Sequence, residues 1–251
     1  MKPPPITRTK AAFVSHSRET GTSYTIYVDA PHGSAAKTPS HAVLAMDGDY
    51  FFDAAAKASR ELAADGRIPP TTVIGVGYGS GFGHPGNFRG RDYTPTASPD
   101  EPTSGGADSF LKYLTHSLWP ELTERYSLLP KGRVIAGHSL GSLLVLHALF
   151  QPKPFFDLAL ASAPSIWWDN RSILKGIARL RDRHASLEGG LYLGVGENDS
   201  PSMSTDLGLL EKQLKDRPFK GLHVVSEVFP GRDHYDVMPH TMAAGLASLL
   251  G

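Results

Sequence analysis

One serine in this sequence is placed where its hydroxyl could act as a nucleophile. Residues 133–147 read RVIAGHSLGSLLVLH, in which a short apolar run typical of a β-strand leads through Gly-His-Ser-Leu-Gly into a run compatible with a helix. A serine at the tip of such a sharp turn has strained backbone angles, and Gly137 and Gly141 let strand and helix approach closely. The turn also directs the N–H of Leu140 toward a negative charge developing beside Ser139. A helix-capping serine is the alternative, but the flanking strand and helix favour the chemical role.

A nucleophilic serine needs a general base, and the base needs a carboxylate that orients it. Glu197 and Asp199 follow the strand-like run 191–195, and His234 follows the last strand-like run, 223–228. Catalytic groups of open α/β sheets collect in loops at the carboxyl ends of strands, where all these side chains are expected. We therefore predict His234 as the base and Asp199 or Glu197 as the acid, since only one of two carboxylates so close together is expected to face the imidazole.

The chain has eleven histidines, so the choice of His234 depends on its place after the last strand. His240, a few residues into the expected terminal helix, is the second candidate. His138, directly before Ser139, is expected to pack or to hydrogen-bond locally rather than to act as the base.

A second donor for a developing oxyanion is expected in residues 45–51, AMDGDYF, which follow a strand-like run. Gly48 allows the backbone to approach a substrate closely, and the backbone N–H of Asp49 is the predicted donor. An ordinary strand-to-helix turn with an aspartate at its cap would explain the same residues.

Elements of two kinds must position these residues. Strand-like segments occur at 11–17, 22–29, 41–46, 72–78, 134–136, 158–162, 191–195 and 223–228, and helix-like segments at 53–64, 110–126, 142–150, 203–215 and 238–250. Alternating strands and helices predict parallel β-α-β units. We expect an α/β protein whose single domain, 1–251, has a doubly wound, mostly parallel sheet with an antiparallel N-terminal strand pair.

One long stretch, residues 79–107, breaks this alternation and is rich in Gly, Pro and Ser. A loop of this length within a compact domain is typically functional, so we predict that it covers the site, opposite a Trp pair formed by Trp167 and Trp168. Those indoles could stack on an aromatic substrate, although one of them is expected to belong to the core. Arg89 and Arg91 could bind an anionic substrate, with a salt bridge to a neighbouring aspartate as the alternative.

Composition excludes several classes of function. The 25 basic and 25 acidic residues cancel, so nucleic acid is a poor expected partner, and the absence of cysteine excludes disulfides and thiol catalysis. No run approaches the roughly 18 apolar residues that span a membrane, and no signal peptide is recognisable at the N-terminus. We expect a cytoplasmic protein that acts on a small-molecule ester, without a metal or a cofactor.

From about Ala42 to Pro239 the chain resembles the esterase D-like family of α/β-hydrolases, and within it the siderophore esterases that open enterobactin-type trilactones. The resemblance depends on Met46-Asp47-Gly48, Arg91-Asp92-Tyr93-Thr94-Pro95, Gly105-Gly106-Ala107, Gly137-His138-Ser139-Leu140-Gly141, Ala163-Pro164-Ser165-Ile166-Trp167-Trp168, Gly196-Glu197-Asn198-Asp199 and Asp233-His234. The chain departs from the family in having Ser142 and Ala163, where many relatives have Gly and Ser.

The resemblance implies an ester hydrolase in which Ser139 is the nucleophile, His234 the base and Asp199 the acid. It implies a siderophore substrate less firmly, because substrate preference resides in the loops. A feruloyl or acetyl esterase, an S-formylglutathione-type thioesterase and an acyltransferase are alternatives among enzymes. A catalytically silent binding module is the alternative of another class, disfavoured by an intact serine, acid and histidine in order.

Overall fold

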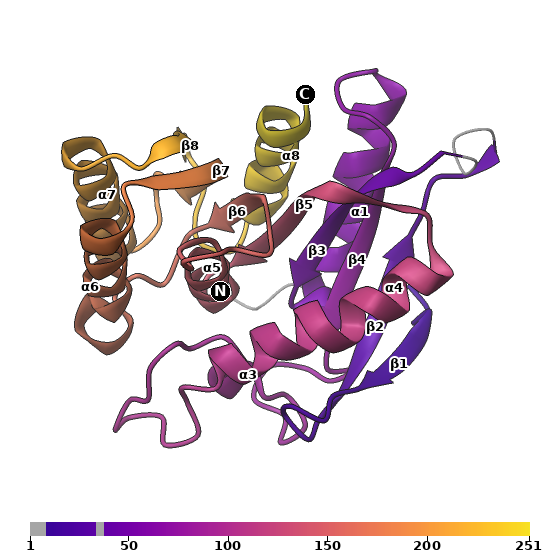
Figure 1. Cartoon of the computed structure of the whole chain (residues 1–251), viewed down its shortest axis with the longest axis horizontal. Helices are drawn as coiled ribbons and strands as arrows, with labels where there is room; N and C mark the ends of the chain where they lie inside the picture. Colours follow the sequence, from indigo (N-terminus) through magenta and orange to yellow (C-terminus); the bar gives the residue numbers. More distant parts are fainter. Residues whose placement is uncertain (1–8, 34–37) are drawn as a thin grey trace.

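The computed structural model describes residues 9–33 and 38–251, which form one eight-stranded sheet with helices on both faces (Figure 1). The strands are β1 (Phe13–His16), β2 (Ser23–Asp29), β3 (Ser40–Met46), β4 (Thr71–Gly77), β5 (Leu128–His138), β6 (Leu158–Ser162), β7 (Ser186–Gly196) and β8 (Lys220–Phe229). Their order across the sheet is β1-β2-β4-β3-β5-β6-β7-β8. Strand β2 is antiparallel to β1 and to β4, and all other neighbours are parallel. The predicted fold class is confirmed.

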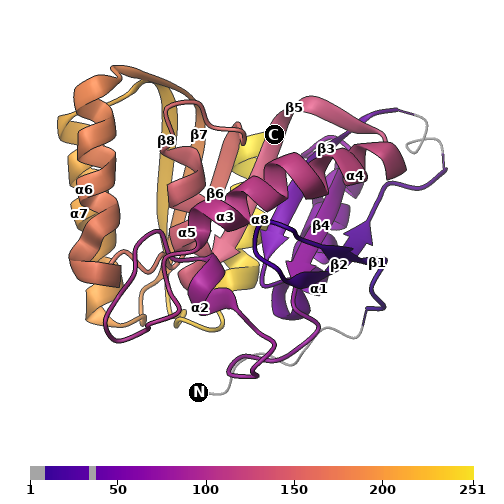
Figure 2. The ribbon, with the colours of Figure 1, turned by 60° about the horizontal axis from the view of Figure 1, so that its bottom comes forward.

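The sheet separates two hydrophobic clusters. One face is covered by α1 (Gly48–Ala64) and α8 (Met238–Leu250). The other face is covered by α3 (Ala107–Lys112), α4 (Trp119–Arg125), α5 (Leu140–Leu149), α6 (Trp168–Arg183) and α7 (Pro201–Asp216), as Figures 1 and 2 show. Central parallel strands are therefore buried on both sides, which is why every residue of β4 is buried and these strands have nearly continuous apolar sequences.

Two helical segments differ from the sequence-based expectation. The helix expected over 110–126 is divided into α3, a π-helical segment η2 (Tyr113–Leu118) and α4, in whose first turn Pro120 contributes no N–H. Helix α6 was not predicted, although its buried residues Ile173, Ile177 and Leu180 have the spacing of an amphipathic helix. Its abundant charged residues obscured that spacing.

The long loop at 79–107 contains a short helix, α2 (Arg89–Asp92), and lies at the end of the sheet near the start of α5 (Figure 2). The buried carboxylate of Asp92 holds it in place by accepting hydrogen bonds from the hydroxyls of Tyr24, at 2.7 Å, and Tyr78, at 3.0 Å. Farther along, the backbone N–H of Gly105 donates to Thr94 Oγ1 at 2.8 Å. The loop is therefore fixed by a hydrogen bond from β2, by one from the residue after β4 and by one within the loop itself.

Parallel register brings the segments after β5, β7 and β8 to one edge of the sheet. His138 pairs with Ser162 of β6, Ser162 with Gly194 of β7, and Gly196 with Phe229 of β8. The residues that follow each of these strands are therefore neighbours in space although they are far apart in sequence. Within the described ranges, no helix is both long and apolar enough to cross a membrane.

Candidate active site

Ser139 occupies the turn between β5 and α5 with φ of 55° and ψ of −119°, angles that cost a non-glycine residue about 1–3 kcal/mol. A Cβ atom on Gly137 would lie 2.5 Å from the carbonyl carbon of Gly141, so only glycine fits at 137. Ser142 Oγ lies 2.7 Å from the carbonyl oxygens of both Gly137 and Ser162. These contacts hold the strained turn and explain how a serine is accommodated at 142.

A continuous chain of polar contacts joins Ser139, His234 and Asp199. His234 Nε2 lies 3.1 Å from Ser139 Oγ, and His234 Nδ1 lies 2.9 Å from Asp199 Oδ2. The Asp199 side chain is 2% exposed, and its other oxygen accepts the N–H of Ser200 at 2.7 Å. With Nδ1–H donating to Asp199, the Nε2 lone pair faces the serine hydroxyl. This is the geometry that a serine nucleophile and its base require.

The other candidates for base and acid lie elsewhere. Glu197 Oε2 accepts the backbone N–H of Gly231 at 2.8 Å, so this side chain supports the loop that carries His234. His240 is on α8, and its ring packs 6.3 Å from the ring of Phe229. Of these candidates, Asp199 and His234 are therefore the two that contact each other, His234 also contacts Ser139, and their catalytic roles stay predictions.

His138 is buried next to His234, as expected for a locally bonded residue. Its Nδ1 lies 3.0 Å from Ser162 Oγ, which in turn accepts the hydroxyl of Thr241 at 2.6 Å. Its ring centroid is 4.7 Å from that of His234. Burial, which disfavours the charged imidazolium, is the main reason that the pKa of His138 lies well below its usual value, so its imidazole is neutral.

The two predicted oxyanion donors lie in the first turns of adjacent helices. Leu140 begins α5 and Asp49 lies in the first turn of α1, and because β3 and β5 are parallel neighbours these helices begin side by side. First-turn N–H groups have no carbonyl one turn earlier to bond. A Cβ atom on Gly48 would lie 2.7 Å from the carbonyl carbon of Gly75, so glycine allows α1 to pack directly on β4. The role of both N–H groups as oxyanion donors stays a prediction.

The Asp49 side chain has a separate structural function. Its carboxylate accepts the hydroxyl of Tyr27 at 2.7 Å and the backbone N–H groups of Tyr78 and Gly79. Burial is the main influence on this group and raises the pKa of Asp49. The side chain therefore anchors the beginning of the long loop.

A second carboxylate, which the sequence analysis did not single out, holds the start of α1. Asp47 has φ of 52°, its backbone N–H donates to the hydroxyl of Tyr93 at 2.9 Å, and its buried side chain receives two hydrogen bonds from Arg89. The Arg89 guanidinium also lies 4.6 Å from the ring centroid of Phe82. Arg89 is thus engaged within the protein, and a bidentate pair of this kind fixes the turn beside Ser139.

Arg91, the predicted substrate-binding arginine, is also engaged within the protein. Its Nε donates to Asp92 at 2.7 Å, and its Nη atoms contact Thr22 Oγ1 at 2.8 Å and the Thr20 carbonyl at 3.3 Å. The guanidinium also covers the ring of Phe88. These contacts favour the alternative of a salt bridge to the neighbouring aspartate, and substrate binding by Arg91 stays a prediction.

The Trp pair divides into one exposed and one buried indole. Trp167 is 46% exposed, while Trp168 is 7% exposed and donates from Nε1 to the Thr96 carbonyl at 3.1 Å. The long loop therefore lies against Trp168, and the expectation that it lies opposite the pair is wrong. The hydroxyl of Ser165, two residues before Trp167, lies 3.4 Å from Ser139 Oγ. The sequence pattern did not predict this contact.

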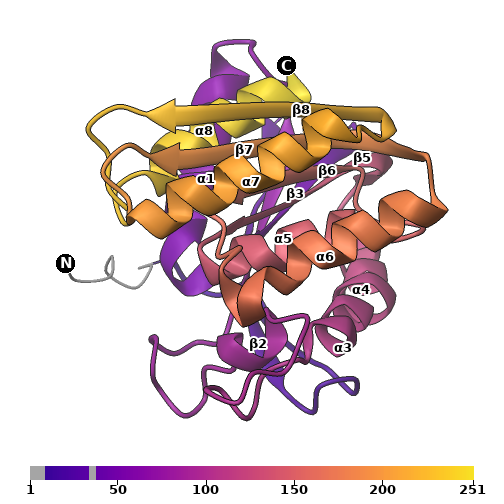
Figure 3. The same ribbon diagram turned by 90° about the vertical axis from the view of Figure 1, so that its left-hand side faces the viewer.

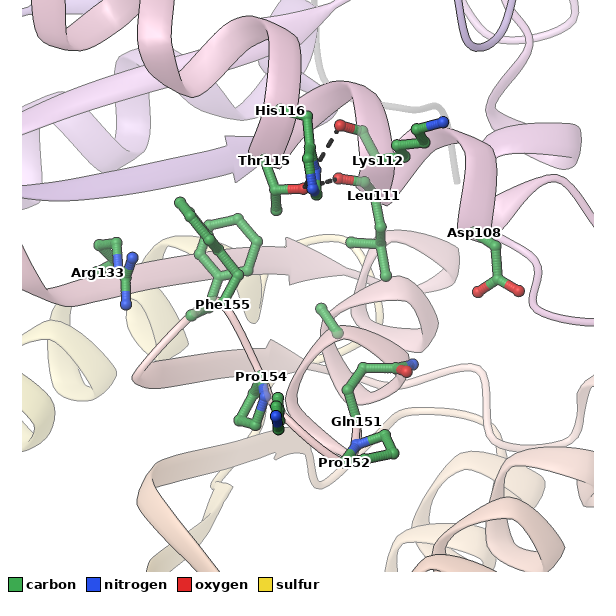
Figure 4. A pocket seen from close by; sticks show the side chains of 13 residues that line it. Asp108, Leu111, Lys112, Thr115, His116, Arg133, Gln151, Pro152, Pro154 and Phe155 are labelled. Carbon is green, nitrogen blue, oxygen red and sulfur yellow. Dashed lines mark hydrogen bonds between the residues drawn. The ribbon is translucent and has the colours of Figure 1, made fainter.

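Two cavities bear on the location of the site. One, of about 300 Å³, lies where His234 meets Asp199, and Tyr235 and Met203 also line it. Another of about 680 Å³ lies near the amino-terminal end of the parallel strands, between Arg133 and Phe155 on one side and Leu111 on the other (Figure 4). The second is larger but lies at the opposite end of β5 from Ser139, whereas His234 and Asp199 themselves line the first.

A mostly parallel eight-stranded sheet with a strained serine after β5 and a histidine after the last strand defines the α/β-hydrolase fold. Within this class, residues 17–247 match the family described as "Putative esterase", and the chain belongs to this esterase family.

The chain is similar to several siderophore esterases. The ferri-bacillibactin esterase BesA of Bacillus subtilis is 28% identical over 255 residues, which cover 92% of this chain and 86% of that protein. The siderophore triacetylfusarinine C esterase of Aspergillus fumigatus is 32% identical over 179 residues, which cover 68% of this chain and 61% of the fungal protein. The crystal structure of the BES protein from Bacillus cereus has a TM-score of 0.86 and 27% identity, covering 100% of this chain and 98% of that one.

Proposed function

We propose that this protein is a serine esterase that hydrolyses carboxylic esters through an acyl-enzyme. Ser139 is the nucleophile, His234 the general base and Asp199 the residue that orients the imidazole. The observation that carries the proposal is the unbroken series of contacts from Ser139 Oγ to His234 at 3.1 Å and from His234 to Asp199 at 2.9 Å. Membership of the esterase family supports the same chemistry.

The reaction then has two halves. Ser139 Oγ attacks the ester carbonyl while His234 Nε2 takes the hydroxyl proton, and the N–H groups of Leu140 and Asp49 stabilise the oxyanion. The tetrahedral intermediate collapses, and His234 gives the proton to the departing alkoxide, which leaves as an alcohol. A water molecule, deprotonated by His234, then attacks the acyl-serine. The second tetrahedral intermediate collapses, the carboxylic acid leaves, and His234 returns its proton to Ser139 Oγ. Asp199 stabilises the imidazolium that forms in both halves.

We propose siderophore esters as the substrate class. Two curated relatives are named as siderophore esterases, one of triacetylfusarinine C and one of enterobactin, and a third is named as a ferri-bacillibactin esterase. Trp167 supports an aromatic substrate. Its side chain is 46% exposed, and it follows two residues after Ser165, whose hydroxyl lies 3.4 Å from Ser139 Oγ. An exposed indole beside an active site can stack on a catecholate ring.

A hydrolysis screen with the purified chain tests the proposal. The substrates are a ferric and an iron-free trilactone siderophore, a short p-nitrophenyl ester, a feruloyl ester and S-formylglutathione. Ser139→Ala removes one oxygen from the turn, so we expect an intact fold, loss of fluorophosphonate labelling and a fall in kcat of several orders of magnitude. A variant that keeps a tenth of the activity would contradict the role of Ser139. Preference for the feruloyl ester or the thioester would contradict the siderophore assignment alone.

A further inference from the structure

Strand β8 ends the sheet with a long, apolar edge that no other described strand pairs with. It runs for ten residues as the outermost strand, and Figure 3 shows it beyond β7 with α7 beneath. Residues 223–228 are all exposed, among them Val224 at 39%, Val225 at 44% and Val228 at 56%. The opposite edge strand, β1, has only four residues. A long edge strand that bears apolar side chains is a site for pairing with another strand.

The hydrogen bonds of β8 show which of its backbone groups remain for a partner. The N–H of Glu197 donates to the Phe229 carbonyl at 3.0 Å, so Phe229 directs its backbone groups toward β7. Backbone direction alternates along a strand. The residues that face away from β7 are therefore Leu222, Val224, Ser226 and Val228. The N–H of Leu222 already donates to the Phe219 carbonyl at 3.3 Å, so Leu222 offers only its C=O to a partner.

We propose that β8 pairs antiparallel with β8 of a second copy of this chain, about a two-fold axis at Val225, so that the two sheets become continuous. In this register Val224 lies opposite the partner's Ser226, and Leu222 opposite the partner's Val228. Both pairs join outward-facing residues, as an antiparallel hydrogen-bonded pair requires. Val224 and the partner's Ser226 can exchange two hydrogen bonds. Leu222 can only accept from the N–H of the partner's Val228, because its own N–H is already bonded to Phe219.

Side-chain chemistry selects this register among the two-fold alternatives. It places His223 opposite the partner's Glu227, so that an imidazole faces a carboxylate on both sides of the axis. Glu227 already accepts the hydroxyl of Tyr192 on Oε2, at 2.6 Å, which leaves Oε1 for the second chain. Moving the axis by one residue would put His223 opposite the partner's Val225 or the partner's Phe229 instead.

The interface also buries the exposed valines. Val225 meets its own copy on the axis, at a non-hydrogen-bonded position where side chains are closest. A cavity of about 380 Å³, bounded by His223, Val225 and Leu249, lies along the same face and offers room for side chains of the second chain. Dimer formation through β8 would therefore bury apolar side chains and also give hydrogen-bond partners to the backbone groups that face away from β7.

Cysteine cross-linking tests the register directly, because the chain has no cysteine of its own. In Val225→Cys the two thiols face each other with Cα atoms about 4.5 Å apart, which a disulfide can span. Val224→Cys is the matched control, since it is similarly exposed but lies opposite the partner's Ser226. After mild oxidation we expect the disulfide-linked dimer to be roughly tenfold more abundant for Val225→Cys than for Val224→Cys on a non-reducing gel. Equal cross-linking, or none at 225, would overturn the proposed register.

Sedimentation equilibrium tests the association itself. We expect a concentration-dependent dimer, and in Val225→Lys a dissociation constant raised on the order of 100-fold, because two ammonium groups would face each other across the axis. Val14→Lys, on the exposed edge strand β1, is the control and should dimerise normally. Ester hydrolysis should be unchanged in both variants. A native chain that stays monomeric throughout the concentration range, or a Val225→Lys variant that dimerises as well as the control, would refute the proposal.

Discussion

Asp199 and Glu197 are two residues apart in one loop, yet only Asp199 reaches the imidazole of His234. Glu197 turns the other way and binds the backbone at Gly231, which lies in the loop that carries the histidine. The two carboxylates therefore have different expected functions. Asp199 acts on the reacting imidazole, and Glu197 holds the loop at a distance from it.

This difference gives a prediction at the residue scale. Asp199→Asn should lower kcat by roughly 10³–10⁴-fold, because the amide neither stabilises the imidazolium nor fixes the required tautomer. Glu197→Gln keeps an oxygen for Gly231 and should change kcat by no more than about threefold. Steady-state kinetics on a p-nitrophenyl ester measures both. The reverse ranking would make Glu197 the acid, and near-normal rates in both variants would indicate a serine-histidine dyad.

The loop at 79–107 is held by the side chains of its own charged residues. Asp92 accepts hydrogen bonds from two tyrosines and Arg91, and Arg89 neutralises the buried Asp47. Both arginines are thus occupied in fastening the loop to the sheet and to the start of α1. This is a reason to expect that the loop shapes the site without supplying a free cation.

At the element scale we expect Arg91→Ala to loosen this loop. Asp92 keeps its two tyrosine donors, so the free energy of unfolding should fall by about 1.5–3 kcal/mol, the range for a lost hydrogen bond to a charged group. The value of kcat/KM should decline to a similar extent for a ferric catecholate ester and for a neutral p-nitrophenyl ester. Urea unfolding and kinetics on both substrates make the measurement. A rise in KM confined to the ferric ester would instead support substrate binding by Arg91.

For the whole molecule, the buried histidine behind the triad couples stability to pH. Burial lowers the pKa of His138, so the folded protein leaves it neutral under conditions in which the unfolded chain protonates it. Below pH about 6.5 the unfolded state therefore binds more protons at this position. This difference in protonation at His138 lowers the free energy of unfolding progressively as the pH falls below about 6.5, and it has no effect at higher pH.

His138→Gln tests this coupling. Glutamine cannot titrate, and its amide oxygen can accept from Ser162 in place of the imidazole. The variant should lack the loss of stability that His138 causes. Its free energy of unfolding minus that of the native chain should therefore increase by up to about 1.4 kcal/mol for each pH unit below about 6.5. Urea unfolding at a series of pH values measures the difference, with His240→Gln, on the exposed side of α8, as the control. Parallel pH profiles for the native chain and His138→Gln would contradict the prediction.

Local sequence determined the turn at Ser139, the order of acid and histidine along the chain and the mostly parallel sheet. Each of these depends on short-range properties, namely glycine at positions where a Cβ atom would clash and the periodicity of apolar residues. Tertiary structure alone decided that Asp199 rather than Glu197 meets His234, that the two arginines bind buried carboxylates, and that Trp167 is exposed while Trp168 is buried. His234 is 95 residues from Ser139 and 35 from Asp199 in the sequence. These three residues meet because of the register of the sheet and the course of the loops after its strands. Both depend on packing over the whole chain and not on the residues next to Ser139, Asp199 or His234 in the sequence.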